Sequence, residues 1–512
     1  MRKKLLFGIA MLIVSIPTFA GGYLTNTNQS VRFLRNPARD GAIGIDGVYS
    51  NPAGVIFLGQ GFHLSVNIQN VHQTRTILTD FPLFVNNATN NSGTLHKFKG
   101  VADAPVLPSL LAAWNKGDWS FQFGFAITGG GGKCEFDEGL GSFEQIVSSM
   151  PFTQVSVGNN TYPITDLMNQ LYGGLGSVNP ALGGHQMGKG YSYDSYMRGR
   201  QYYYGFTLGA ARKLSDNLSV YLGARMLYGS ANYYGYVKNI QVEHIENGVS
   251  SMVQGSKHFT EQAALFNQYA GALEAMGMME QAAQLKQGAA LSTSLATATE
   301  DIELNCDQTG WGVAPIIGID YHTEKWNLAA KYEFKTRMRL KNKSANSKSA
   351  EGIAMLDKFK DGNSVAEDTP AMLTLGAQYS PIKSLRINAG YHHYFDVDTK
   401  QWNKSEIGDT NEYLLGVEYD INKLLEVSAG GQLTRYDQND SHMSDISFNI
   451  NSYSFGFGLG INLKENIKLN LAYFQTNYED YDMESKVSEA MSVKNSFTRT
   501  NRVLGIGVDF KF

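Results

Sequence analysis

The chain has 512 residues, with 43 Lys and Arg against 47 Asp and Glu, for a formal net charge of -4. This balance provides no basic field that would attract nucleic acid. The composition, with 54 Gly, 28 Tyr and 27 Phe against 12 Pro, argues against a set of ordinary soluble domains. It is typical of strands that face lipid on one side and water on the other.

Residues 1–20 have the pattern of a secretory signal peptide. Three basic residues follow Met1, the stretch Leu5–Pro17 is apolar, and the segment ends on small residues at Ala20. The alternative, a membrane anchor helix, needs a longer apolar run to cross ~30 Å of hydrocarbon. No later segment has the ~20 consecutive apolar residues of a transmembrane helix. We therefore expect an exported chain that crosses a membrane, if at all, with strands.

Residues 21–60 carry two Asn-Pro-Ala triplets, which begin at Asn36 and Asn51, together with scattered Gly. Pro and Gly break both helices and strand ladders, so this segment is predicted to be irregular. We predict that it is a hatch that plugs the periplasmic end of a barrel formed by residues 61–512. A flexible tail is the alternative.

The chain after Gly61 alternates in polarity with a period of two. In residues 119–128 aromatic and aliphatic side chains share one face, and Ser, Gln, Gly, Ala and Thr share the other; 385–392 and 452–463 repeat the pattern. Tight polar turns, such as 115–118 and 420–423, alternate with long loops, such as 130–197. This sorting of connections is typical of outer-membrane barrels and has no reason to occur in a soluble sandwich.

We therefore predict an all-β fold, a transmembrane antiparallel β-barrel of about 14 strands, each near the ~9–11 residues of a spanning strand. The predicted strands are 61–72, 106–114, 119–129, 198–213, 218–238, 303–322, 326–340, 370–380, 384–399, 410–420, 424–437, 449–463, 467–478 and 499–512.

Small helices are predicted in the long loops. In residues 259–290, Phe266, Tyr269, Leu273 and Met276 recur at helical spacing. Two interpretations remain open at this stage. The helices pack on each other and cap the barrel mouth, or their apolar faces form a groove that first captures an apolar substrate.

Basic residues are candidates for a substrate carboxylate, which needs a cationic partner. Arg225 and Arg386 lie on predicted inward faces, and Arg32 and Arg35 lie on the hatch. The alternative is that each pairs with an acidic side chain of the lumen.

Cys134 and Cys306 fall at the predicted extracellular rim of an exported chain, where disulfides persist. A disulfide between them would join two long loops. The alternative is two free thiols, because a bridge needs Cα atoms within ~7 Å.

Catalytic and metal motifs are absent from the sequence. It contains neither a G-x-S-x-G elbow nor an H-E-x-x-H helix. His392 and His393 are neighbours on a predicted strand, so their side chains diverge and form no metal pair. We expect no enzymatic activity, no metal and no cofactor.

Specific features of the chain are similar to a known family. A Gly-Tyr pair at Gly22 is followed about thirty residues later by Asn51-Pro52-Ala53-Gly54, and Thr369–Gly376 and the closing aromatic strand also match. In these features the chain resembles the FadL/OmpP1/TodX family of outer-membrane transporters of long-chain fatty acids and other hydrophobic compounds.

The resemblance implies a fourteen-stranded barrel whose hatch motif is Asn51, Pro52, Ala53 and Gly54. It also implies substrate capture in extracellular loops, binding against the hatch, and lateral release into the membrane near a kink of the third strand. In this chain Gly124, Gly129 and Gly130 are the candidates for that opening.

The function expected from the sequence is therefore transport of fatty acids or other hydrophobic compounds across the outer membrane of a Gram-negative cell. The expected partners are hydrophobic small molecules, outer-membrane lipid and the outer-membrane assembly machinery, and the chain is expected to be a monomer. The alternatives are a general diffusion porin and a surface adhesin or other structural barrel.

Overall fold

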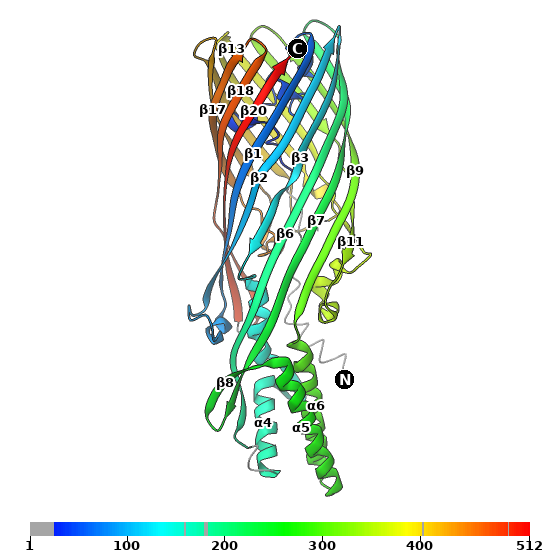
Figure 1. Cartoon of the computed structure of the whole chain (residues 1–512), viewed down its shortest axis with the longest axis vertical. Coiled ribbons are helices and arrows are strands. Elements are labelled where there is room, and N and C mark those ends of the chain that lie inside the picture. Colours follow the sequence, from blue (N-terminus) through cyan, green and yellow to red (C-terminus); the bar gives the residue numbers. More distant parts are fainter. Residues whose placement is uncertain (1–24, 158–159, 179–182, 402–403, 490) are drawn as a thin grey trace.

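The computed structural model describes residues 25–512 apart from 158–159, 179–182, 402–403 and 490. The predicted signal peptide and the first four residues of the predicted hatch lie outside the described residues. Within them, fourteen strands pair in antiparallel order and close into one barrel, because the first strand also pairs with the last (Figure 1). The predicted fold class is confirmed.

The fourteen barrel strands, in chain order, are β1 (Gly61–Asp80), β2 (Leu95–Lys116), β3 (Trp119–Phe136), β6 (His185–Lys213), β7 (Leu218–Glu246), β9 (Ile302–His322), β10 (Trp326–Glu333), β13 (Ala371–Ile382), β14 (Leu385–Phe395), β15 (Thr410–Asp420), β16 (Leu425–Arg435), β17 (Ser452–Lys464), β18 (Ile467–Tyr478) and β20 (Met491–Lys511). Shorter strands extend the sheet or pair in loops: β4 (Gln154–Val157), β5 (Asn160–Pro163), β8 (Val249–Gln254), β11 (Arg339–Ser344), β12 (Ser364–Ala366) and β19 (Tyr481–Ser488).

The described α-helices are α2 (Val31–Arg35), α3 (Gly141–Ser149), α4 (Ile164–Val178), α5 (Gly255–Ala275) and α6 (Met279–Ala298). The described 3-10 helices are η1 (Ile45–Val48), η2 (Gly54–Leu58), η3 (Pro82–Asn86), η4 (Met150–Phe152), η6 (Lys348–Gly352), η7 (Ala354–Phe359), η8 (Asp396–Asp398) and η9 (Asp440–His442). Among these, no helix combines the length and apolarity needed to cross a bilayer.

The outer surface of the barrel is apolar, as the alternation predicts. Leu208, Leu222, Leu415 and Leu504 are all more than half exposed, and exposed aliphatic and aromatic side chains recur on most strands. A continuous exposed apolar belt of this extent fits lipid rather than water. Near the tight turns the belt ends in aromatic rings, as at membrane interfaces: Trp114, Trp119, Tyr321, Trp326 and Tyr419.

Several strands are longer than predicted. β6 and β7 have 29 residues each, against the ~9–11 of a spanning strand. They continue past the barrel end as an extension in which His185 of β6 pairs with Glu246 of β7, and the short strand β8 pairs with the other edge of β7 (Figure 1). The predicted strands were too short because two antiparallel strands can continue to pair in water beyond the membrane, where the thickness of the hydrocarbon layer sets no limit.

Apolar side chains from several long loops meet at the barrel end opposite the tight turns. We call this the mouth cluster. It contains Ile77, Phe81, Phe84, Phe98, Phe136, Leu140, Met197, Tyr233, Leu304, Phe359, Phe448 and Phe497, all buried. These loops therefore close on each other by apolar packing.

Helices α4, α5 and α6 form a separate helical cap beyond that end, next to the β6–β7 extension (Figure 1). Phe266 and Leu273 are 0% and 2% exposed in its interior, whereas Met276 at the tip is 71% exposed. The predicted capture groove is therefore wrong for Phe266 and Leu273, because the three helices bury these side chains against one another and leave them unavailable to a substrate. Tyr269 packs partly buried against the same interior.

Candidate functional site

The N-terminal segment 25–60 occupies the barrel lumen near the tight-turn end, where it is drawn in dark blue (Figure 1). Its side chains are buried there; Val31, Leu34, Arg35 and Val55 are each 0% exposed. Helix α2 begins because the Ser30 hydroxyl accepts a hydrogen bond from the Phe33 N–H at 3.2 Å. The described part of the predicted hatch therefore lies inside the barrel.

The second Asn-Pro-Ala triplet makes hydrogen bonds to three different strands. Asn51 Nδ2 donates to Asp320 Oδ2 of β9 at 2.6 Å. The carbonyl of Pro52 accepts from Gln122 of β3, and the carbonyl of Ala53 accepts from Ser219 of β7, both at 2.7 Å. Backbone carbonyls that an irregular segment leaves unpaired are thus satisfied by inward-facing side chains of the wall.

Gly54 completes the motif. Its N–H donates to Asn51 Oδ1 at 3.1 Å, and a Cβ at this position would lie 2.4 Å from the Asn51 amide and 2.9 Å from the Asp320 carboxylate. Only glycine therefore allows the Asn51 side chain to reach Asp320.

The first triplet, for which the sequence suggested no role, docks against inward-facing glycines. A Cβ at Gly416 would lie 1.9 Å from Asn36 Oδ1, and a Cβ at Gly456 would lie 2.0 Å from the carbonyl of Leu34. Such close approach of two backbones requires glycine on the wall. The hatch thus rests on Gly416 of β15 and on the alternating glycines of β17, which are Gly456, Gly458 and Gly460.

Buried ion pairs join the hatch to one side of the wall. Arg39 contacts Glu418 at 2.6 Å, and Arg32 contacts Asp509 at 2.8 Å. Arg35, which is fully buried, lies 2.5 Å from Glu426. Arg32 and Arg35 are therefore neutralised, and neither is available as the predicted carboxylate site.

The two predicted wall cations are neutralised as well. Arg225 binds both oxygens of Glu333, at 2.6 and 2.7 Å, and stacks on Tyr49 of the hatch. Arg386 contacts Asp420 at 2.7 Å and Glu426 at 2.8 Å. The prediction was wrong for all four arginines because each has an acidic partner on another strand, which a cation in the lumen requires.

The ladder between β2 and β3 is interrupted. Lys133 pairs with Asp103 and Phe125 pairs with Leu110, but β3 residues 126–132 have no partner in the described part of β2. Over the same stretch β3 stays paired with β6, with two register shifts. The barrel wall therefore has a local break on one side of β3.

Local sequence explains the break. Pro105 and Pro108 of β2 lack the N–H that a ladder needs. On β3, Gly130 and Gly132 have φ of 80° and 98°, which other residues rarely adopt. The break was not predicted, although two prolines inside one strand indicate an interrupted ladder.

Of the three glycines predicted to form a lateral opening, two lie in the break and one lies in the regular ladder. Gly129 and Gly130 lie in the break. Gly124 pairs regularly with Leu111 and Thr207 on either side, so its assignment to an opening was wrong.

The start of the hatch covers the free edge of β3. Thr25 forms an antiparallel bridge with Gly129, and the Asn26 N–H donates to the carbonyl of Thr128 at 2.9 Å. The Asn26 side chain also donates to the carbonyl of Gly130, at 2.7 Å. Neutral hydrogen bonds from the hatch thus take the place of the missing β2 partners.

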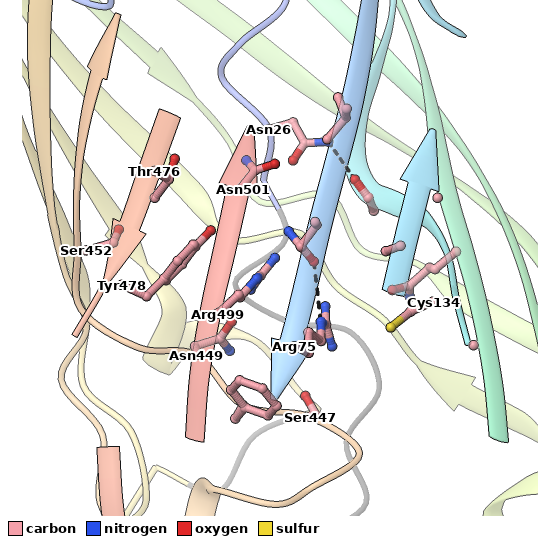
Figure 2. A pocket seen from close by; sticks show the side chains of 18 of the residues that line it. Asn26, Arg75, Cys134, Ser447, Asn449, Ser452, Thr476, Tyr478, Arg499 and Asn501 are labelled. Carbon is pink, nitrogen blue, oxygen red and sulfur yellow. Dashed lines mark hydrogen bonds between the residues drawn. The ribbon is translucent and has the colours of Figure 1, made fainter. Parts of the chain in front are cut away.

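A cavity of about 250 Å³ lies between the start of the hatch and the mouth cluster (Figure 2). Phe33 and residues 25–28 of the hatch line one side, and Phe136, Met197 and Phe448 of the mouth cluster line another. The cavity borders the break in the wall through Gly130 and Gly132.

Two arginines enter this cavity from neighbouring strands. Arg75 of β1 is directly opposite Arg499 of β20 in the ladder, and both line the cavity (Figure 2). Arg75 lies over the ring of Phe448 and Arg499 over the ring of Tyr478. Neither forms an ion pair with a carboxylate of the described residues, and the Nε of Arg499 is buried without a hydrogen-bond partner among them.

Cys134 and Cys306 are both free. Cys134 pairs with Gly199 of β6, Gly199 with Tyr233 of β7, and Tyr233 with Cys306 of β9. The two thiols are therefore at one level but three strand spacings apart, on the order of 14 Å. This distance excludes the predicted disulfide, which requires Cα atoms within ~7 Å.

No protein-family model and no curated protein sequence matches the chain. Solved structures do match. A Pseudomonas aeruginosa FadL homologue aligns with 96% of this chain and 100% of its own, at 11% identity and a TM-score of 0.59.

The deltaS2S3 mutant of the TodX monoaromatic hydrocarbon channel aligns with 94% of this chain and 99% of its own, at 15% identity and a TM-score of 0.50. The toluene transporter TodX of P. putida aligns with 92% of this chain and 94% of its own, at 14% identity and a TM-score of 0.49. The first two likenesses show that the chain shares the fold of these channels.

Proposed function

We propose that this chain, whose fold is that of the FadL homologue and the TodX channel, is a non-enzymatic outer-membrane channel for hydrophobic compounds. The observation that carries the proposal is a cavity lined on one side by the hatch, next to a break in the barrel wall whose edge the hatch itself covers. The names of the structural neighbours, a FadL homologue and a monoaromatic hydrocarbon channel, support hydrophobic cargo.

The proposed path runs from the mouth cluster into the cavity and then sideways through the break. An apolar molecule gains ~0.8 kcal/mol for each CH₂ removed from water, so an aqueous pore offers it no favourable route. Exit through the wall delivers it to lipid without exposing it to water again. In this path Asn26 and its neighbours leave the edge of β3 while the rest of the hatch stays docked.

Substrate class is the finer part of the proposal. A cavity of about 250 Å³ is smaller than the ~300–1,000 Å³ of common small-molecule pockets, so it accommodates a compact apolar compound or one end of a longer chain. Arg75 and Arg499 supply two cations for an anionic head group. We therefore infer a hydrophobic carboxylate, such as a fatty acid, bound head-first against β1 and β20.

A general diffusion porin is the competing function. The buried ion pairs that cross the lumen, such as Arg39–Glu418, favour a plugged barrel over an open pore. Among the described residues, no feature specifically favours a surface adhesin.

A binding experiment tests the substrate class. Purified protein is titrated with oleate and with oleyl alcohol, which differ only in the head group. Charge-assisted hydrogen bonds contribute ~1.5–3 kcal/mol, so oleate is expected to bind about 10- to 150-fold more tightly. Arg75→Gln with Arg499→Gln is expected to remove that preference, while Arg435→Gln, a surface control, retains it.

Planar-bilayer conductance tests the channel type. The plugged channel is expected to conduct almost no ions, and mass spectrometry of the purified protein is expected to find apolar ligands. Steady conductance of large unit size, with no binding of either probe, would establish the porin instead.

A further inference from the structure

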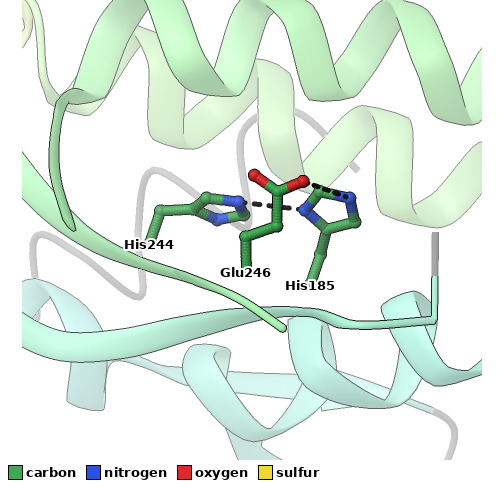
Figure 3. A group of neighbouring side chains, drawn as sticks. All are labelled: His185, His244 and Glu246. Carbon is green, nitrogen blue, oxygen red and sulfur yellow. Dashed lines mark hydrogen bonds and ion pairs between the residues drawn. The ribbon is translucent and has the colours of Figure 1, made fainter. Parts of the chain in front are cut away.

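Two histidines and a glutamate converge where the β6–β7 extension meets the helical cap (Figure 3). His185 Nδ1 lies 3.0 Å from His244 Nε2, and His185 Nε2 lies 4.0 Å from Glu246 Oε1. One ligand atom from each residue lies within 4.8 Å of the other two. Donors around a tetrahedral Zn²⁺ with bonds of ~2.0–2.1 Å are separated by roughly 3.3 Å, so small side-chain rotations suffice.

The backbone places these three side chains on one face. His244 and Glu246 are two residues apart on β7, so strand alternation points them the same way. His185 is the direct cross-strand partner of Glu246, and cross-strand partners share a face. The cluster is therefore a consequence of the register between β6 and β7.

The helical cap covers the cluster and adds a third imidazole. The ring of Tyr172 from α4 lies 6.3 Å from His185 and 6.4 Å from His244. The ring of His258 from α5 lies 4.7 Å from that of His244. His244 is 8% exposed, and its Nδ1 is buried without a hydrogen-bond partner among the described residues.

We propose that His185, His244 and Glu246 bind one divalent transition metal of the Zn²⁺ type, and that His258 rotates to complete the coordination. Two or three imidazoles with one carboxylate are a donor set that suits Zn²⁺, Cu²⁺ or Ni²⁺, whereas Ca²⁺ and Mg²⁺ prefer oxygen alone. The Glu246 side chain is 60% exposed and leaves an approach for the ion from water.

The sequence contains only a weak signal for this site, the spacing His244-x-Glu246, because His185 is contributed from 59 residues upstream.

A metal here would tie two parts of the extracellular assembly together. His185, His244 and Glu246 belong to the strand extension, and His258 belongs to the cap helix α5. Coordination by both would fix the cap on the extension, independently of any cargo in the barrel.

Metal binding is tested on the full chain in detergent, purified without a histidine tag. Isothermal titration and elemental analysis after dialysis are expected to give one Zn²⁺ per chain and no Ca²⁺. His185→Ala and His244→Ala are expected to weaken Zn²⁺ binding by more than the ~10–100-fold lost when a residue that only hydrogen-bonds to a metal ligand is changed. Glu246→Gln retains the shape and size of the side chain and is expected to weaken binding less.

His72→Ala is the matched control, because His72 is an exposed histidine that does not belong to the cap. Its Nδ1 lies 2.5 Å from Asp103 Oδ1. It is expected to bind Zn²⁺ as the wild type does. The proposal is overturned if the wild type retains no Zn²⁺ at micromolar free metal, or if the His185 and His244 variants, with unchanged circular dichroism, bind as tightly as the wild type.

Limited proteolysis tests the role of the metal in the cap. The turn between α5 and α6 is exposed at Met276 and Met279, and Zn²⁺ is expected to slow cleavage within the cap of the wild type only. A cleavage rate that Zn²⁺ leaves unchanged in the wild type would contradict the bridge between strands and cap.

Discussion

The hatch meets the barrel wall in two different ways on its two sides. Toward β15, β16 and β20 it is held by buried ion pairs, such as Arg39–Glu418 and Arg32–Asp509. Toward β3 it is held by neutral hydrogen bonds, chiefly from Asn26. Losing one partner of a buried ion pair destabilises by ~3–5 kcal/mol, whereas a neutral hydrogen bond contributes ~0.5–1.5 kcal/mol.

Under the proposed path, this difference predicts which part of the hatch moves. A segment opens first where its local contacts are weakest. The start of the hatch covers both the cavity and the break in the wall, and its contacts with β3 are the weaker set. Opening this part alone would admit cargo to the break while the ion pairs keep the lumen closed to ions.

The largest expected effect comes from joining the start of the hatch to β3 covalently. Thr25→Cys with Gly129→Cys, in a background with Cys134→Ser and Cys306→Ser, places two thiols at bridged positions. Oxidation is expected to stop the uptake of a fluorescent fatty acid into protein-containing vesicles, and reductant is expected to restore it. The single variant Thr25→Cys is the control; wild-type uptake by the oxidised double variant would show that this part need not move.

The next effect concerns the charged side. Glu418 contacts Arg39 at 2.6 Å and Arg386 at 3.2 Å, so Glu418→Gln leaves buried cations under-paired. A destabilisation of hatch docking by ~3–5 kcal/mol is expected, visible as raised ion conductance in a planar bilayer. Asp103→Asn, in an exposed pair, is expected to leave conductance unchanged. Equal conductance of all three proteins would remove the ion pairs from the explanation of the plug.

A smaller effect is expected at the hatch motif. Asn51→Ala removes the hydrogen bond to the Asp320 carboxylate and the side-chain acceptor of the Gly54 N–H. Asp320 keeps its bond from Asn327, and the Gly54 N–H keeps the backbone carbonyl of residue 51. The expected loss is ~1–3 kcal/mol, measured as faster amide hydrogen exchange over residues 47–54. Asn90→Ala, in an exposed loop, is the control; unchanged exchange in Asn51→Ala would mean that the motif does not hold the hatch.

The smallest effect is expected at the start of the hatch itself. Asn26→Ala removes the side-chain hydrogen bond to Gly130 but keeps the backbone bond to Thr128. A change of ~0.5–1.5 kcal/mol is expected to raise the uptake rate by up to about tenfold without raising ion conductance. Raised conductance in this variant would contradict the idea that the contacts with β3 can open while the ion pairs keep the lumen closed to ions.

The strands could be read from the sequence because alternation and tight turns are local signals. The predicted strands 410–420 and 467–478 have the bounds of β15 and β18. The alternation did not predict the ends of β6 and β7, because their extension lies in water, where no face of the strands is required to be apolar. Loop helices were found from their spacing, but spacing alone does not distinguish a groove from a packed interior such as that around Phe266.

The site was only partly predictable. The irregular segment 21–60 was predicted because Pro and Gly exclude regular structure locally, and its described part lies in the lumen. The motif Asn51–Gly54 within it was identified only through the family resemblance. The assignment of Arg32 failed because its partner, Asp509, is 477 residues away, and no local pattern reports such a partner. Arg75 was missed because the predicted first strand ended before it. Arg499 began the predicted last strand, but its position opposite Arg75 depends on barrel closure.

The sequence by itself determined the antiparallel strands, the apolar outer face, the irregular N-terminal segment and the order of short and long connections, since each follows from the chemistry of adjacent residues. Only the tertiary structure decided which cations are neutralised, which glycines support the hatch, where the wall is interrupted and which histidines meet at the cap. Those outcomes depend on barrel closure and strand register, which bring distant residues to the same level and face.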